Sequence, residues 1–168
     1  MATSLQRVWR HLFAPSAQAL YPKASLQRIA AAIAQGETRH RGQVCFAVDS
    51  ALPIGALLAD HDARSCAHEA FARLRVWDTA ANNGVLIYLL VADHRIEIVA
   101  DRGLDGRVAP SQWAAVCRKM EQGLRTGEAE AAALTGVEMV SALLAEHFPR
   151  TGADEAHNEL PDLPHILG

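Results

Sequence analysis

The side chains best suited to chemistry carry oxygen and lie on either side of the longest apolar run of the chain, Val85–Ala92. They are two carboxylates, one hydroxyl and two amides: Asp78, Thr79, Asn82, Asn83 and Asp101. Oxygen ligands without histidine or thiolate favour calcium or magnesium over a transition metal. We therefore take Asp78, Asn82 and Asp101 as candidate ligands of Ca²⁺ or Mg²⁺. Neighbouring positions that could contact a bound ligand are Trp77, Thr79, Asn83 and Arg102.

The same residues also have a purely structural interpretation. Asp-Thr and Asn-Asn-Gly are turn formers whose side chains bond to their own backbone, and residue type alone favours this role. Arg75 and Arg102 could neutralise the nearby carboxylates and make an internal network. Trp77, an aromatic beside a polar loop, is more often a lid on the core than the wall of a ligand or partner groove. Both interpretations stay open at this point.

Three phosphatase signatures are incomplete in this chain. Arg39–Gly42 resembles the Arg-His-Gly motif of histidine phosphatases, but it precedes the first predicted strand instead of following it, so a solvated helix end is the better interpretation. Asp49 ends that strand as a haloacid-dehalogenase nucleophile does, yet Ala51 stands where a second aspartate is needed. None of the three cysteines has an arginine six positions later. Asp101–Gly106 imitates an EF-hand loop start but has Gln112 at position twelve.

Periodicity predicts the elements that would position these residues. Val44–Val48 is a short apolar run that fits a strand buried on both faces. A helix capped by Asp60 or Asp62 follows and runs to about Arg75, and Leu52–Leu58, broken by Pro53 and Gly55, reads as a connection. Helices are also predicted for about 4–13, from Pro22 onward, from Pro110 to Thr126, and for 128–147.

Strand, helix, strand predicts a right-handed parallel βαβ unit of Val44–Val48 and Val85–Val91. The Asp93-His94 pair predicts a tight hairpin to an antiparallel edge strand that ends at Asp101. Asp101 would then lie at the N-terminal end of Val85–Val91, beside Asn82 and Asn83. The fold class is thus α/β: a small mixed sheet covered by helices.

The 168 residues suit one domain. We expect a helical lead-in over 1–20, the main domain over 21–149 and an extended tail over 150–168. The net charge of −3 argues against a nucleic-acid partner. No signal peptide or membrane-spanning run is recognised, which predicts a cytoplasmic protein without direct membrane insertion. Three cysteines on separate elements suggest a reducing compartment.

The central stretch resembles the TPM domain, a family named after a thylakoid-lumen phosphatase, a photosystem II repair protein and a receptor modulator. The resemblance lies in Trp77-Asp78-Thr79, Asn82-Asn83-Gly84-Val85-Leu86 and Arg95 through Leu104. It covers roughly residues 20–149, and within the family the chain resembles a soluble bacterial branch. It implies a three-layer α/β/α sandwich around a mixed sheet. Acid phosphatase activity and divalent-cation binding, proposed for some members, would fall on Asp78, Asn82, Asn83 and Asp101.

Two departures from the family bear on function. Many relatives are exported or membrane-anchored, which this sequence does not indicate, and Gln18-Ala19-Leu20-Tyr21 replaces an acidic residue ahead of the first long helix. Our first hypothesis is a non-catalytic binding or adaptor module, with a divalent cation, that docks on a membrane or envelope protein. The alternative is a metal-dependent acid phosphatase acting on phosphate monoesters.

Overall fold

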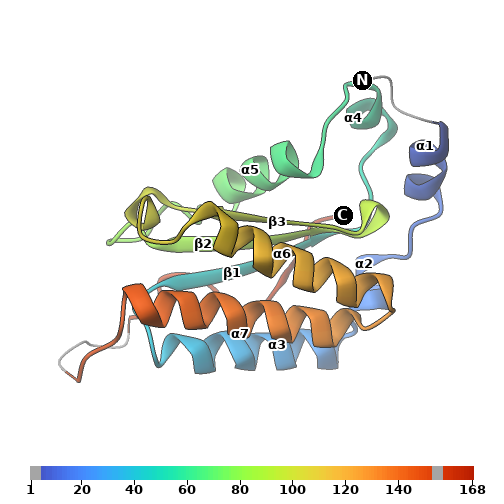
Figure 1. The fold of residues 1–168 in the computed structure, drawn as a ribbon. Helices are drawn as coiled ribbons and strands as arrows, with labels where there is room; N and C mark the ends of the chain where they lie inside the picture. The colour runs from blue at the N-terminus through green and yellow to red at the C-terminus, as the bar shows by residue number, and fades with distance from the viewer. Residues whose placement is uncertain (1–4, 153–156) are drawn as a thin grey trace.

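The computed structural model describes residues 5–152 and 157–168, and it forms three layers around a four-stranded sheet (Figure 1). The sheet order is β3-β2-β1-β4. Helices α3, α6 and α7 cover one face, α5 covers the other, and α1 stands at one end of the molecule. The α/β/α sandwich expected from the sequence is confirmed.

The sheet contains the predicted parallel pair and the predicted hairpin. Strand β1 (Gln43–Asp49) runs parallel to β2 (Gly84–Leu90), and β3 (Arg95–Ala100) is antiparallel to β2. Strands β1 and β2 are apolar and buried on both faces, as expected for parallel strands between helical layers. Asp49 is aligned with Leu90, so it lies at the edge of the sheet opposite to Asn83 and Asp101.

The thicker core lies between the sheet and three long helices, α3 (Lys23–Glu37), α6 (Pro110–Arg125) and α7 (Ala129–His147). Gly136 weakens α7 intrinsically, but it lets α6 approach closely. A Cβ at position 136 would lie 2.1 Å from the sulfur of Met120. Packing between the two helices therefore explains this glycine.

The second face is covered by α5 (Ala63–Arg73), which Asp62 caps by accepting from the Ser65 N–H at 2.7 Å. One expectation here is wrong: the 52–58 segment contains a short helix, α4 (Ile54–Leu58). Pro53 does not break it, because proline is well suited to the residue that opens a helix.

The hairpin connection is longer than the predicted Asp93-His94 pair. It consists of a 3-10 turn, η1 (Val91–Asp93), and His94 in the left-handed conformation at φ 48°. After β3 a second 3-10 turn follows, η2 (Arg102–Leu104). The longer turn places the Asp93 carboxylate against α1, a contact that local sequence cannot indicate.

Both ends of the described chain fold back onto the domain. The helices α1 (Leu5–Leu12) and α2 (Ala17–Leu20) precede α3; Ser4, included in the predicted first helix, lies outside the described residues. The last segment adds strand β4 (His165–Ile166), parallel to β1. Residues 153–156 of the predicted tail also lie outside the described residues.

His40 corrects the interpretation of Arg39–Gly42 as a solvated helix end. Its side chain is fully buried, and Nδ1 lies 3.1 Å from the carbonyl oxygen of Gly42. Burial lowers the pKa of His40 to about 4, so the ring is neutral at neutral pH. It is buried because the chain at Pro149 bridges back to it, a long-range pairing.

Candidate functional site

The predicted polar site lies where the α5–β2 loop meets the end of β3. Two glycines make this contact close. A Cβ at Gly84 would lie 2.0 Å from the carbonyl oxygen of Val76, and one at Gly103 would lie 2.4 Å from that of Asn82. Asn82 adopts a left-handed conformation at φ 51°, which asparagine tolerates better than most residues.

The structure brings Asn82, Asp101 and Arg102 together. The Nε of Arg102 donates to Asn82 Oδ1 at 3.2 Å, and the Gly103 N–H donates to the Asn82 carbonyl at 2.8 Å. The Asp101 N–H extends the sheet by donating to Gly84 O at 2.9 Å. We call Asn82, Asp101 and Arg102 the polar rim.

Asp101 is the residue of the polar rim that has a carboxylate oxygen without a hydrogen-bond partner in the described residues. Its Oδ1 accepts from the Arg102 N–H at 2.7 Å and begins η2. Its Oδ2 is buried and has no hydrogen-bond partner among residues 5–152 and 157–168. An unsatisfied buried carboxylate oxygen is costly, by about 1–3 kcal/mol or more.

Thr79 and Asn83 are buried instead of facing a ligand. The hydroxyl of Thr79 accepts from the Asn83 N–H at 3.1 Å, and the Asn83 side-chain amide donates to the Arg41 carbonyl at 2.8 Å. These bonds tie the loop to the start of β1. The structural interpretation thus describes both residues well, although Asn83 Oδ1 has no partner in the described structure.

Trp77 and Asp78 stand apart from the rim. Asp78 pairs with Arg75 at 2.6 Å, and the same guanidinium lies 5.8 Å from the centroid of the Trp77 ring. Trp77 is 48% exposed, so the expectation of a lid on the core is wrong. No hydrogen bond or ion pair within the described residues connects Asp78 to Asn82 or Asp101.

The metal set predicted from the sequence is therefore only partly assembled. In the part of the chain that the structure describes, no group of three or more His, Cys, Asp or Glu side chains is placed to hold a metal ion. Asn82 is engaged by Arg102, and Asp78 by Arg75. Asp101 is the predicted ligand that keeps a buried carboxylate oxygen without a hydrogen-bond partner in the described residues.

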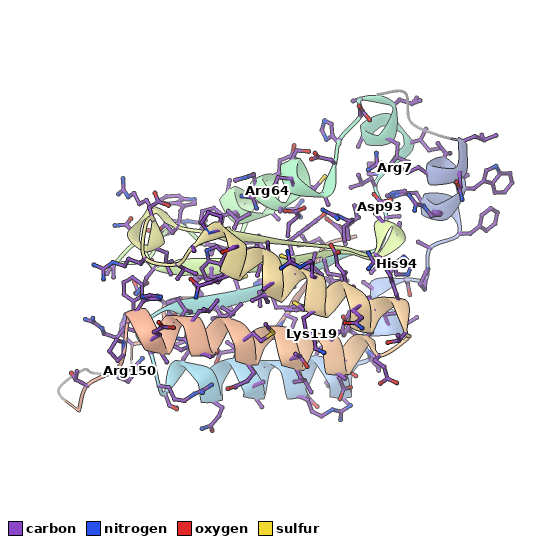
Figure 2. The ribbon with its side chains drawn as sticks, in the orientation of Figure 1. Arg7, Arg64, Asp93, His94, Lys119 and Arg150 are labelled. Atoms are coloured by element: carbon purple, nitrogen blue, oxygen red, sulfur yellow. The ribbon has the colours of Figure 1, made fainter. Side chains whose placement is uncertain are left out.

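A second polar cluster, which sequence reasoning missed, fixes α1 to the hairpin. Arg7 donates to Asp93 Oδ2 through Nε at 3.1 Å and Nη2 at 3.0 Å, and Arg10 donates to Oδ1 at 3.0 Å. The ring of His11 receives the Leu52 N–H on Nδ1 at 2.9 Å. Its Nε2 lies 3.1 Å from Asp93 Oδ1 without hydrogen-bond geometry. We call Arg7, Arg10, His11 and Asp93 the α1 clamp; Figure 2 shows Arg7 beside Asp93.

The protonation states of the clamp follow from burial and charge. Burial favours the neutral form of Asp93, but the Arg7 hydrogen bonds and the neighbouring charges outweigh it and lower the pKa of the carboxyl. Burial lowers the pKa of His11, against the opposing effect of Asp93. At neutral pH the clamp thus joins one carboxylate to two guanidinium groups.

Because the clamp uses the polar face of α1, the apolar face is turned outward. Four large side chains on this face are each more than half exposed: Leu5, Trp9, Leu12 and Phe13. The rings of Trp9 and Phe13 stack with centroids 5.1 Å apart. The spacing of Arg7, Arg10 and His11, all on one side of the helix, was the available sequence signal.

The comparisons with known proteins agree with the fold. A TPM domain family model matches residues 16–143. The chain belongs to the TPM domain family. An NMR structure of the BA42 protein from the psychrophilic bacterium Bizionia argentinensis is similar, with a TM-score of 0.74 and 24% identity over 85% of this chain and 92% of that one. At this identity the similarity supports the fold alone, and no curated protein matches.

The match also bounds the site. The family model spans the polar rim and Asp93 but begins after α1, so the three clamp residues on that helix lie outside the matched residues. In the described ranges every helix is too short or too polar to cross a lipid bilayer.

Proposed function

We propose that this TPM domain is a non-catalytic binding module that docks on a membrane or envelope protein through the outward face of α1. The observation that carries the proposal is the orientation of this helix. An amphipathic helix on a soluble domain normally buries its apolar stripe. Here Trp9 and Phe13 point to solvent while Arg7 and His11 face the domain.

The composition of this face suits a protein partner. Interface hot spots are rich in large aromatic residues, and contiguous exposed apolar patches commonly mark interaction sites. The helix has 8 residues, far fewer than the roughly 20 needed to span a bilayer. It is also held by ion pairs, which preorganise it for docking.

Co-sedimentation with the membrane fraction of the source cells tests this proposal. We expect the double variant Trp9→Ser/Phe13→Ser to lose at least tenfold in bound protein. Leu163→Ser is the matched control, since Leu163 is also more than half exposed but lies far along the chain, near β4. Equal binding of the wild type and the double variant would exclude α1 as the docking face. Protease treatment of the membranes separates a protein partner, whose loss abolishes binding, from a lipid surface.

We propose in addition that the polar rim binds Ca²⁺ or Mg²⁺ through Asp101. The support is the buried, unpartnered Oδ2, which a hard cation would satisfy. The carbonyl oxygens of Ala81 and Asn82 lie close to Gly103 and are of the right chemical type. Arg102 holds Asn82 through its side chain, so a bound cation would compete with that guanidinium.

Titration with calcium and magnesium, followed by backbone NMR, tests the cation site. We expect amides of 81–84 and 101–104 to shift at millimolar metal in the wild type and not in Asp101→Asn. Asp78→Asn should keep the shifts, because Asp78 is paired with Arg75. Unshifted amides in the wild type would remove the cation from the proposal.

The same two variants separate the binding module from the phosphatase alternative. A metal-dependent phosphatase would hydrolyse p-nitrophenyl phosphate, and Asp101→Asn would abolish the hydrolysis. The binding module predicts no metal-dependent hydrolysis above that of buffer.

A further inference from the structure

Strand β3 lies at the edge of the sheet, so one side of its backbone is not paired with another strand. The Asp101 N–H donates to Gly84 O. Along β3, residues that bond to β2 alternate with residues whose backbone groups point away, so this bond shows which residues belong to each set. Ile96, Ile98 and Ala100 therefore turn their N–H and C=O groups away from β2.

Two outward groups in the first part of β3 are bonded to side chains. Glu121 accepts from the Ile96 N–H at 3.2 Å, and Arg64 donates to the Ile98 carbonyl at 2.6 Å. Such protection is how natural sheets avoid pairing with other chains.

Ala100 differs from Ile96 and Ile98, each of which has one outward group bonded to a side chain. Its outward N–H and C=O have no hydrogen-bond partner in residues 5–152 and 157–168. They open onto a groove of about 540 Å³ between the start of α5 and the start of α6. Arg64, which lines this groove, lies on α5 (Figure 2).

The walls of the groove are apolar, and an exposed arginine lies at its edge. Val108 is buried and Trp113 is half-buried. Arg107 is exposed, its guanidinium lies 4.9 Å from the Phe148 ring centroid, and it has no ion pair among the described residues. Arg64 pairs with Glu97 at 3.4 Å, so Arg107 is the groove arginine available to an acidic ligand.

We propose that this groove binds an extended peptide segment, which adds to β3 by pairing with Ala100. The outward N–H and C=O of one extended residue can bond to the C=O and N–H of another strand. A simple ion or phosphate would bond to only one of the two groups. An apolar side chain of the peptide would pack on Val108 and Trp113, and a carboxylate would approach Arg107. This proposal does not depend on the docking of α1 or on the cation.

The probe is the capped peptide acetyl-Val-Glu-Val-Glu-Val-amide, titrated into the labelled full-length chain and followed by NMR. We expect the Ala100 amide and the Trp113 indole N–H to shift. The lysine counterpart, acetyl-Val-Lys-Val-Lys-Val-amide, should bind at least tenfold more weakly. Arg107→Glu should weaken binding of the acidic peptide as strongly, whereas Arg118→Glu, an exposed arginine outside the groove lining, should not.

Ala100→Pro tests the strand pairing directly. It removes the outward N–H but no bond of the β2–β3 ladder, so the fold should persist and peptide affinity should fall at least tenfold. Methylation of the peptide nitrogens gives a test with the unaltered protein. In an added strand, methylation of one alternate set of amides abolishes binding and that of the other set does not. Equal effects of both sets, unchanged binding to a folded Ala100→Pro chain, or no shifts near Ala100 at several millimolar peptide would overturn the proposal.

Discussion

Replacing Asp93 by asparagine should release α1 from the domain while leaving the core folded. The Asp93 carboxylate is nearly buried and interacts with Arg7, Arg10 and His11. Asparagine keeps one acceptor oxygen but loses the charge that both guanidinium groups face. The change therefore weakens the hold on α1 without altering the apolar core, to which the outward face of α1 does not contribute.

The expected magnitude follows from burial. Removing one partner of a buried ion pair costs about 3–5 kcal/mol. Arg10 is half exposed and its share is screened, so we expect about 2–3 kcal/mol for the docking of α1. This corresponds to a roughly 30- to 150-fold rise in the population of undocked α1.

Amide hydrogen exchange is the appropriate assay, because it resolves local opening from global unfolding. Amides of α1, such as the Phe13 N–H that donates to Trp9 O at 3.1 Å, should exchange faster by that factor. Amides of β1 and β2 should keep the wild-type rate. Asp105→Asn, which removes an exposed carboxylate, is the control and should change neither set.

The pH dependence of the clamp follows from the lowered pKa of Asp93. An acid whose pKa is lowered by folding stabilises the docked state above its ordinary pKa of 3.8, and loses that contribution only as the pH falls through the lower value. Docking should thus be constant from pH 7 to 8. Below the ordinary histidine pKa of 6.5 it should weaken, because burial lowers the pKa of His11 and the docked state resists its protonation. If α1 exchanges at the wild-type rate in Asp93→Asn, the clamp is not what orients the helix, and the reasoning fails.

Two further predictions concern the core. Burial raises the pKa of Glu37 to about 7, so between its ordinary value of 4.5 and 7 the unfolded chain releases a proton that the folded chain keeps. The Glu37 contribution to stability should therefore fall by about 3 kcal/mol from pH 5 to pH 8, while the lowered pKa of His40 acts in the opposite direction. In urea unfolding the wild type should thus lose about 3 kcal/mol relative to Glu37→Gln over this range. Gly84→Ala should destabilise the fold by about 3 kcal/mol or more, because its Cβ would lie 2.0 Å from the Val76 carbonyl oxygen. Gly55→Ala, with no atom within 4 Å of the added Cβ, should keep or slightly raise the thermal midpoint, because alanine is the better helix former in α4. Equal midpoints for both variants would contradict the steric argument.

Local sequence patterns predict most of the helices and strands and their basic arrangement. Apolar runs predicted β1 and β2 as buried strands, and the strand-helix-strand order predicted a parallel pair. The sequence offered Asp60 or Asp62 as the cap of α5, and the structure shows that it is Asp62. These features depend on local periodicity and capping, which act over a few residues. The hairpin alone predicts that Asp101 lies beside Asn82, because the end of the second strand returns to the start of the first.

Only the tertiary structure decided which side chains are available for binding. The sequence contained the stripe of α1, but its outward direction depends on Asp93, more than 80 positions away. His40 is buried by pairing with Pro149. The backbone of Ala100 is left unpaired because the side chains from α5 and α6 bond to Ile98 and Ile96, which precede it in β3. Long-range ion pairs and packing make these choices, and such contacts leave no local periodicity in the sequence.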